Sequence, residues 1–245
     1  MKRAITLFLA SHVPALGAVK RWLVAWWDAV RPVRSTYSQH GEDVWFLAEL
    51  RGGPPERRTY VDVGANHPTS LSNTYLLYRS GMRGVVVEPN QELLALHRRT
   101  RPLDRAVGVG CAAEARLGTF QVASTPVLST FSTGGVQDVG YVPSIVRTEY
   151  VPLLPLDLVV EALELGQVGL LSIDTEGLDH EVLLGAARLL ERTALVCVEA
   201  NDEEARARVH ALLGERFEPV RQFGCNHVFR NRRLAGTPAS GAAGT

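Results

Sequence analysis

The chain has 245 residues, of which 46% are apolar and 21% are charged, a composition that is ordinary for a globular domain with a sizeable core. Its 26 lysine and arginine residues balance its 26 aspartate and glutamate residues, so the formal net charge at neutral pH is zero. This balance argues against a nucleic-acid partner, because nucleic-acid-binding proteins usually carry a basic excess or a basic stripe.

Residues 1–36 are expected to form a helical extension ahead of the main domain. Trp22, Trp26 and Val30 lie four residues apart, which gives the predicted helix a strongly aromatic face. Three interpretations stay open: the helix packs on the domain or on a partner, it rests on the inner face of a membrane, or it belongs to a cleaved signal. No stretch reaches the roughly 20 apolar residues that span a bilayer.

The cysteines Cys111, Cys197 and Cys225 are odd in number and lack a C-x-x-C spacing. They predict reduced thiols in a cytoplasmic protein and argue against a disulfide framework or a zinc site. The oligomeric state stays open at this point, a homo-oligomer included.

Residues 37–231 are expected to form one domain, and 232–245 a flexible tail. Within the domain, short apolar runs rich in β-branched residues alternate with helical patterns. The predicted strands cover 59–63, 84–87, 106–109, 119–122, 169–173 and 195–198, and the predicted helices 71–80, 90–99, 179–191 and 202–213. Apolar strands separated by helices are typical of a parallel sheet that is covered on both faces.

The last element differs from this pattern. Two strand-like runs, 217–223 and 227–231, flank the turn Gly224-Cys225-Asn226 and predict a β-hairpin whose final strand runs antiparallel. A mostly parallel sheet that ends in such a hairpin is the layout of Rossmann-like methyltransferases, whereas nicotinamide-binding Rossmann domains generally lack it. The predicted fold is therefore α/β and Rossmann-like, with seven strands in the main sheet.

Ligands of open α/β sheets bind beyond the carboxyl ends of the strands. The first strand runs into the turn Gly64-Ala65-Asn66, where glycine permits close approach of a ligand and asparagine tolerates a left-handed conformation. The second and third glycines of a dinucleotide fingerprint are absent, which argues against an NAD-dependent oxidoreductase. Ala112 follows the third strand at the same predicted edge.

Two acidic residues at this edge suit S-adenosylmethionine. Asp62 suits the methionine ammonium, and Glu88, 26 positions later, suits the two ribose hydroxyls. Either residue alone would be better explained structurally, Asp62 as a turn cap and Glu88 as a solvated strand end. The pair at this spacing favours binding of the adenosine-containing cofactor.

Segments from 37 to 201 together resemble the FkbM-type methyltransferases. They are Tyr37 to Asp43, Val61 to Asn66, Ser72 to Tyr75, Gly84 to Pro89, Arg101-Pro102, Leu128 to Thr130, Ser172 to Gly177, and Glu181 to Leu183 with Gly185. The resemblance implies a class I methyltransferase fold over 37–231, S-adenosylmethionine as the methyl donor, and a hydroxyl acceptor on a sugar, glycolipid or polyketide. His67 and Thr175 depart from the family pattern, and residues 1–36 have no counterpart in it.

The resemblance also implies that the segment around Gln39 folds over the methionine end of the cofactor. The residues by themselves predict a capping arrangement, with Ser38 or Gln39 as the N-cap and Glu42 in the first turn of a helix. Both interpretations can hold together.

Methyl transfer to a hydroxyl needs a general base, or a metal that acidifies the hydroxyl. Asp174 ends a buried strand and is the first candidate base, with helix capping as the alternative. His180, one turn into the next helix, and His67 are further candidates, although a lone histidine there is often a surface residue. Glu199 and Asn201 end the neighbouring strand and would complete a Mg²⁺ site with Asp174. The simple acid–base site is favoured over the metal.

The polar stretch 124–140, which includes Ser129 and Thr130, is expected to form part of the acceptor wall, because so long a loop is usually functional. A noncatalytic nucleotide-binding module of the same fold is the alternative class of protein. Such a module would be expected to lose acidic groups at the fourth and fifth strand ends, yet Asp174 and Glu199 are present.

Overall fold

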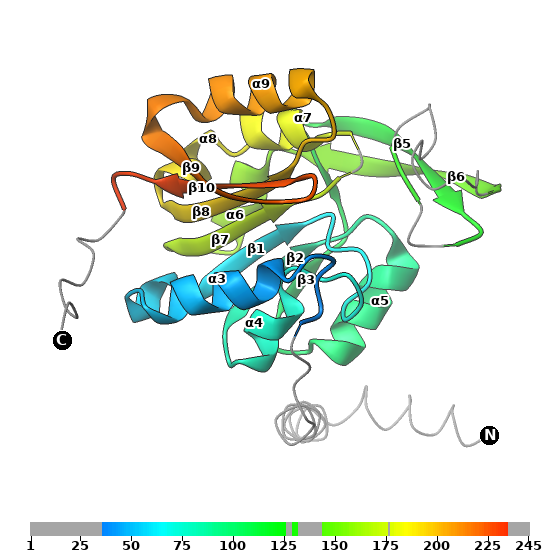
Figure 1. Cartoon of the computed structure of the whole chain (residues 1–245). Helices are drawn as coiled ribbons and strands as arrows, with labels where there is room; N and C mark the ends of the chain where they lie inside the picture. Colours follow the sequence, from blue (N-terminus) through cyan, green and yellow to red (C-terminus); the bar gives the residue numbers. More distant parts are fainter. Residues whose placement is uncertain (1–35, 126–128, 132–143, 176, 235–245) are drawn as a thin grey trace, which may run out of the picture.

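The computed structural model describes residues 36–125, 129–131, 144–175 and 177–234. Its central sheet has the order β3-β2-β1-β7-β8-β10-β9 (Figure 1). The strands are β1 (Thr59–Val63), β2 (Arg83–Val87), β3 (Arg105–Val107), β7 (Val168–Ile173), β8 (Thr193–Glu199), β9 (Phe217–Phe223) and β10 (Asn226–Asn231). The first five in the sheet order are parallel, and β10 is antiparallel to both of its neighbours. The class I methyltransferase fold is therefore confirmed.

Helices cover both faces of this sheet (Figure 1). One face packs on α3 (Glu42–Arg51) and α4 (Tyr75–Arg79), and the other on α6 (Leu156–Ala162), α7 (Asp179–Leu184), α8 (Ala187–Glu191) and α9 (Glu203–Leu213). α5 (Gln91–Thr100) connects β2 to β3. Because helices cover both faces of the sheet, every residue of β7 is buried.

Side chains of β1 alternate between these two faces, as the pleat requires. Val61 and Val63 belong to the core beneath α6–α9, whereas Tyr60 belongs to the core beneath α3 and α4. Asp62 shares the parity of Tyr60, so its carboxylate lies on the α3/α4 side.

β9 and β10 form the terminal hairpin, and β10 lies between β8 and β9 in the sheet. Its last residue, Asn231, is fully buried, and its side-chain amide donates to the carbonyls of Leu190 and Thr193 at 3.1 and 3.0 Å. These bonds fix the end of the chain's last strand to the start of β8.

A second, three-stranded sheet lies beside the first one (Figure 1). It has the order β4-β6-β5, with β4 (Gly110–Cys111), β5 (Arg116–Ala123) and β6 (Ile145–Leu154). The predicted strand 106–109 is wrong in its second half, because the chain leaves the main sheet after Val107. β6 and α6 were not predicted at all, and Pro152 within β6 is unusual for a strand.

Two predicted helices are shorter in the structure. The prediction of 71–80 is wrong at its start, where Leu71 has a positive φ of 55° and only α4 is helical. The prediction of 179–191 is interrupted at Gly185, where a Cβ would lie 2.3 Å from the Ala112 carbonyl oxygen. The predicted helix is thus divided into α7 and α8 at a glycine whose contact with Ala112 leaves no room for a side chain.

The predicted extension 1–36 lies outside the described residues except for Thr36, and the predicted tail 232–245 except for 232–234. The interpretations that depend on Trp22 and Trp26 therefore concern residues outside this part of the chain. Among the helices of the described ranges, none combines the length and the apolar character that a membrane crossing requires.

Candidate active site

A pocket opens at the carboxyl ends of β1, β2 and β7. Its polar wall contains Gly64, Asn66, Glu88 and Asp174, and the second sheet contributes to its apolar wall. The pocket has about 520 Å³ of unfilled space when its open mouth is included. The position agrees with the rule for ligands of open α/β sheets.

The turn after β1 forms the floor of this pocket. Gly64 has a φ of 74° and Asn66 a φ of 48°, both left-handed. The amides of Gly64 and Ala65 donate to the Val87 carbonyl at 3.0 and 3.2 Å, which joins the turn to β2. A Cβ on Gly64 would lie 1.9 Å from the Asp174 carbonyl oxygen, so the loops after β1 and β7 touch through their backbones.

Gly64→Ala is expected to destabilise the protein by about 2 kcal/mol or more, because it adds a backbone clash to the left-handed strain. Gly81→Ala is the matched control, since Gly81 has a φ of 93° and nothing within 4 Å of its would-be Cβ. Urea unfolding of both variants measures the difference. Equal destabilisation would show that the contact with Asp174 contributes nothing.

Glu88 is the buried acid of the pocket, at 5% exposure. One carboxylate oxygen accepts from the Asn66 amide and the other from the Asn90 amide, both at 2.8 Å. Burial raises the pKa of Glu88 to about 7, against the opposing effect of these two hydrogen bonds. Each oxygen keeps further lone pairs, so the carboxylate can still accept two hydroxyl groups.

Asp62 is 6% exposed and is not one of the residues that line the pocket. Its carboxylate accepts a 2.5 Å hydrogen bond from the Thr74 hydroxyl. Burial raises the pKa of Asp62, and the charge of Arg101 and the Thr74 hydrogen bond oppose the rise. Asp62 and Glu88, which look alike in the sequence, thus occupy different environments.

The remaining predicted cofactor residues fall into two groups. Ala65 and Ala112 are buried beside the pocket, and the Ala112 amide donates to the Leu154 carbonyl at 3.1 Å. Gln39 is exposed and does not line the pocket. Of the predicted set, the structure brings Gly64, Asn66 and Glu88 together in the pocket wall.

The predicted N-cap at Ser38 or Gln39 is wrong, because the N-cap of α3 is Gly41. Asp43 instead folds back and accepts from the Tyr37 amide at 2.7 Å and the Ser38 hydroxyl at 2.9 Å. Glu42 is fully buried and accepts from the side-chain amide of Asn226 at 3.0 Å. The start of α3 is therefore bonded to the terminal hairpin.

Asp174, the first candidate base, is half-buried in the pocket wall. It does not cap α7, because Leu178 is the N-cap and makes no side-chain cap bond. The backbone amides of Thr175 and Gly177 donate to the Asp179 carboxylate at 3.0 and 3.3 Å. The carboxylate that holds this turn is thus Asp179, which sequence reasoning missed.

Glu199 and His180 do not line the pocket. Glu199 accepts from the Cys225 thiol at a sulfur–oxygen distance of 3.2 Å. Burial and this bond to Glu199 raise the pKa of Cys225 to about 12, so the thiol stays protonated. Within the described ranges, no three side chains of His, Cys, Asp or Glu form a group that could hold a metal ion.

His67 lies in the first crevice loop, as predicted. Its Nδ1 lies 3.1 Å from the Ser70 amide and 3.3 Å from the Thr69 amide, and accepts from both. These bonds give His67 a structural role in its own turn.

The apolar wall of the pocket was not predicted. Phe120 of β5 and Phe131 pack with ring centroids 4.7 Å apart, and both line the pocket. Ser129 accepts from the Asn90 side-chain amide at 3.2 Å and so lies on the Glu88 side. The expected acceptor wall at Ser129 and Thr130 is thus part of the same pocket as Glu88.

Comparisons with known proteins identify the family of the chain. The family model described as methyltransferase FkbM domain matches residues 62–230, and no curated protein matches the chain. Cofactor-bound Rv0187 from MTB aligns with a TM-score of 0.45 and 15% identity, over 93% of this chain and 96% of that one. An O-methyltransferase from Bacillus cereus in complex with SAH aligns with a TM-score of 0.46 and 11% identity, over 92% and 96%. Because the family model covers more than half of the sequence, the chain belongs to the FkbM methyltransferase domain family.

Proposed function

We propose that this methyltransferase uses S-adenosylmethionine to methylate a hydroxyl group on a sugar, glycolipid or polyketide-type small molecule. The observation that carries the proposal is Glu88, a buried carboxylate in the wall of a pocket that also has an aromatic side. A carboxylate suits the two ribose hydroxyls, and an apolar wall suits a purine base.

The residues present fit the cofactor. Phe120 and Phe131 offer an apolar surface on one side, and Glu88 offers acceptors on the other. Gly64 has no side chain, so the backbone of the turn after β1 is accessible to a ligand. Bound S-adenosylmethionine would supply an activated methyl group.

The protein's own contribution to the transfer is placement and proton removal. Asp174 lies in the wall of the same pocket and is our proposed base for the acceptor hydroxyl. We favour Asp174 over Glu199 and His180 as the base, because neither of these two residues lines the pocket. A Mg²⁺ ion bound by Asp174, Glu199 and Asn201 is the second proposal for activating the hydroxyl.

Calorimetry with S-adenosylhomocysteine tests the cofactor assignment, and we expect micromolar binding. A parallel titration with NADH tests the oxidoreductase alternative, for which we expect no binding. Binding without methyl transfer to any component of a source-cell extract, followed with labelled donor, would favour the noncatalytic nucleotide-binding module. The absence of S-adenosylhomocysteine binding would overturn the proposed function.

We propose further that the protein acts in the cytoplasm and touches the inner face of the membrane through its N-terminal segment. The full chain should co-sediment with anionic liposomes, and a version that begins at Arg34 should not, because it lacks Lys20, Arg21 and the tryptophans at 22, 26 and 27. Equal sedimentation of the two would favour packing of that segment on the domain or on a second copy.

A further inference from the structure

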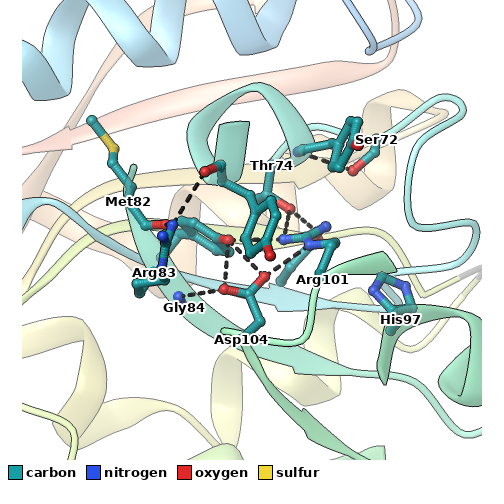
Figure 2. A network of polar contacts seen from close by, with 12 residues as sticks. Ser72, Thr74, Met82, Arg83, Gly84, His97, Arg101 and Asp104 are labelled. Atoms are coloured by element: carbon teal, nitrogen blue, oxygen red, sulfur yellow. Dashed lines mark hydrogen bonds and ion pairs between the residues drawn. The ribbon is translucent and has the colours of Figure 1, made fainter. Parts of the chain in front are cut away.

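A fully buried arginine, Arg101, lies in a network of polar contacts that includes Thr74 and Asp104 (Figure 2). Arg101 donates from Nε to Asp104 at 2.8 Å, and from Nη2 to the Thr74 hydroxyl at 2.9 Å and the Tyr60 hydroxyl at 3.0 Å. Its guanidinium also lies over the ring of Tyr78, 5.7 Å from the centroid. Its Nη1 is buried without a hydrogen-bond partner in the described part of the chain.

Thr74 connects this arginine to Asp62. Its hydroxyl has a single hydrogen, which it donates to Asp62 while its oxygen accepts from Arg101. The direction of both bonds is therefore fixed, running from the guanidinium through the hydroxyl to the carboxylate. Thr74 is fully buried, so water does not compete for these bonds.

The charges of this cluster do not balance. Arg101 is one cation among two buried carboxylates, Asp62 and Asp104. Tyr60 stays neutral, because burial raises its pKa well above the usual value. When both carboxylates are ionised, one negative charge is left over, and a cationic ligand group would neutralise it.

We propose that Arg101, acting through Thr74, is a positioning residue that keeps Asp62 charged and oriented to receive the ammonium group of the cofactor's methionine end. This inference rests on the proposed function. Without a neighbouring cation, a carboxyl as buried as Asp62 would favour its neutral form. Thr74 holds one carboxylate oxygen, Oδ2, and the ammonium would take the other.

Comparing the affinities for two ligands distinguishes this positioning role from a purely structural one. S-adenosylhomocysteine carries the amino-acid ammonium, whereas 5′-methylthioadenosine has the same nucleoside without it. Thr74→Val removes the hydroxyl at nearly constant volume and is expected to weaken S-adenosylhomocysteine about tenfold, while 5′-methylthioadenosine changes less than about twofold. Thr74→Ser restores the hydroxyl and should restore most of the affinity. Calorimetry measures both ligands.

Thr193→Val is the matched control, because Thr193 is equally buried and its hydroxyl donates to the Leu189 carbonyl, away from the pocket. It should leave the affinities for both ligands unchanged. Arg101→Lys keeps the charge and should cost less affinity for S-adenosylhomocysteine than Arg101→Gln, with circular dichroism confirming that each variant is folded. If Arg101→Gln does not fold, the variants Thr74→Val and Thr74→Ser test the proposal without it.

Equal weakening of both ligands by Thr74→Val, or no weakening of either, would overturn the inference and leave a structural role. Selective loss of S-adenosylhomocysteine with rescue by serine would support it. Failure of the wild-type protein to bind either ligand would instead contradict the proposed function, so the two failures are distinguishable.

Discussion

Asp174→Asn is expected to lower methyl transfer by roughly 10²-fold or more, while the affinity for S-adenosylhomocysteine stays within about threefold. The substitution is nearly isosteric and removes the proton acceptor at the pocket wall. It leaves intact the backbone contacts of this loop, namely the bond from the Asp174 amide to Val63 and the contact with Gly64. Transfer of labelled methyl groups to acceptors in a source-cell extract, compared with calorimetry, measures the two effects.

The metal alternative makes a different prediction for the same variant. A Mg²⁺ site would lose activity in EDTA, regain it with added Mg²⁺, and respond to Glu199→Gln as strongly as to Asp174→Asn. We expect resistance to EDTA and a milder effect at Glu199, which does not line the pocket. Near wild-type transfer by Asp174→Asn would contradict both roles and direct the search to His180 or His67.

Glu88→Gln is expected to weaken S-adenosylhomocysteine at least tenfold, about 1.4 kcal/mol. The amide keeps the size of the side chain but accepts only one of the two ribose hydroxyls well. It also loses the bond with one of the two backbone amides, those of Asn66 and Asn90. Calorimetry at pH 8, where the wild-type carboxyl is ionised, measures this difference.

The wild-type affinity should also depend on pH through Glu88. Its pKa is raised to about 7, so the ionised form that binds the ribose falls roughly tenfold as the pH is lowered from 8 to 6. Binding is therefore strongest above pH 7 and weakens below it, and Glu88→Gln should flatten this profile. A profile that keeps its slope in the variant would assign the titration to another group.

The stability of the free protein should follow the opposite trend. The native state binds the Glu88 proton more tightly than the unfolded state, because its pKa is raised from 4.5 to about 7. The contribution of Glu88 to stability is thus greatest at low pH and declines as the pH rises between these values. Urea unfolding of wild type and Glu88→Gln across this range isolates the contribution.

The main sheet could be predicted because local sequence patterns agree with the overall fold. The apolar runs of β1, β2, β7 and β8 are bounded by glycine or acidic residues, and the hairpin turn at 224–226 identifies the terminal strands. The second sheet could not be predicted in the same way. β6 pairs with β5 through contacts distant in sequence, and it exposes apolar residues such as Tyr150, so its sequence lacks the alternation of a half-buried strand.

In the candidate site, too, residues with a local sequence pattern could be predicted, and residues placed by tertiary packing could not. Glu88 could be placed in the pocket because it directly follows a buried strand, and Gly64 because a turn must follow β1. Asp62 lies within β1 and not at its end, and its bond to Thr74 depends on tertiary packing that no local pattern predicts. Phe131 reaches the pocket through tertiary packing with Phe120, for which no local pattern exists.

The position of β10 has a consequence for biosynthesis. The last strand of the described residues is an interior strand, so β8 has no partner on that side until residues 226–231 have left the ribosome. Until then, the unpaired edge of β8 and the side chains that β10 covers are open to other chains, which is the usual route to aggregation. Nascent chains stalled before Asn226 should therefore depend on chaperones, whereas chains released after Asn231 can complete the sheet.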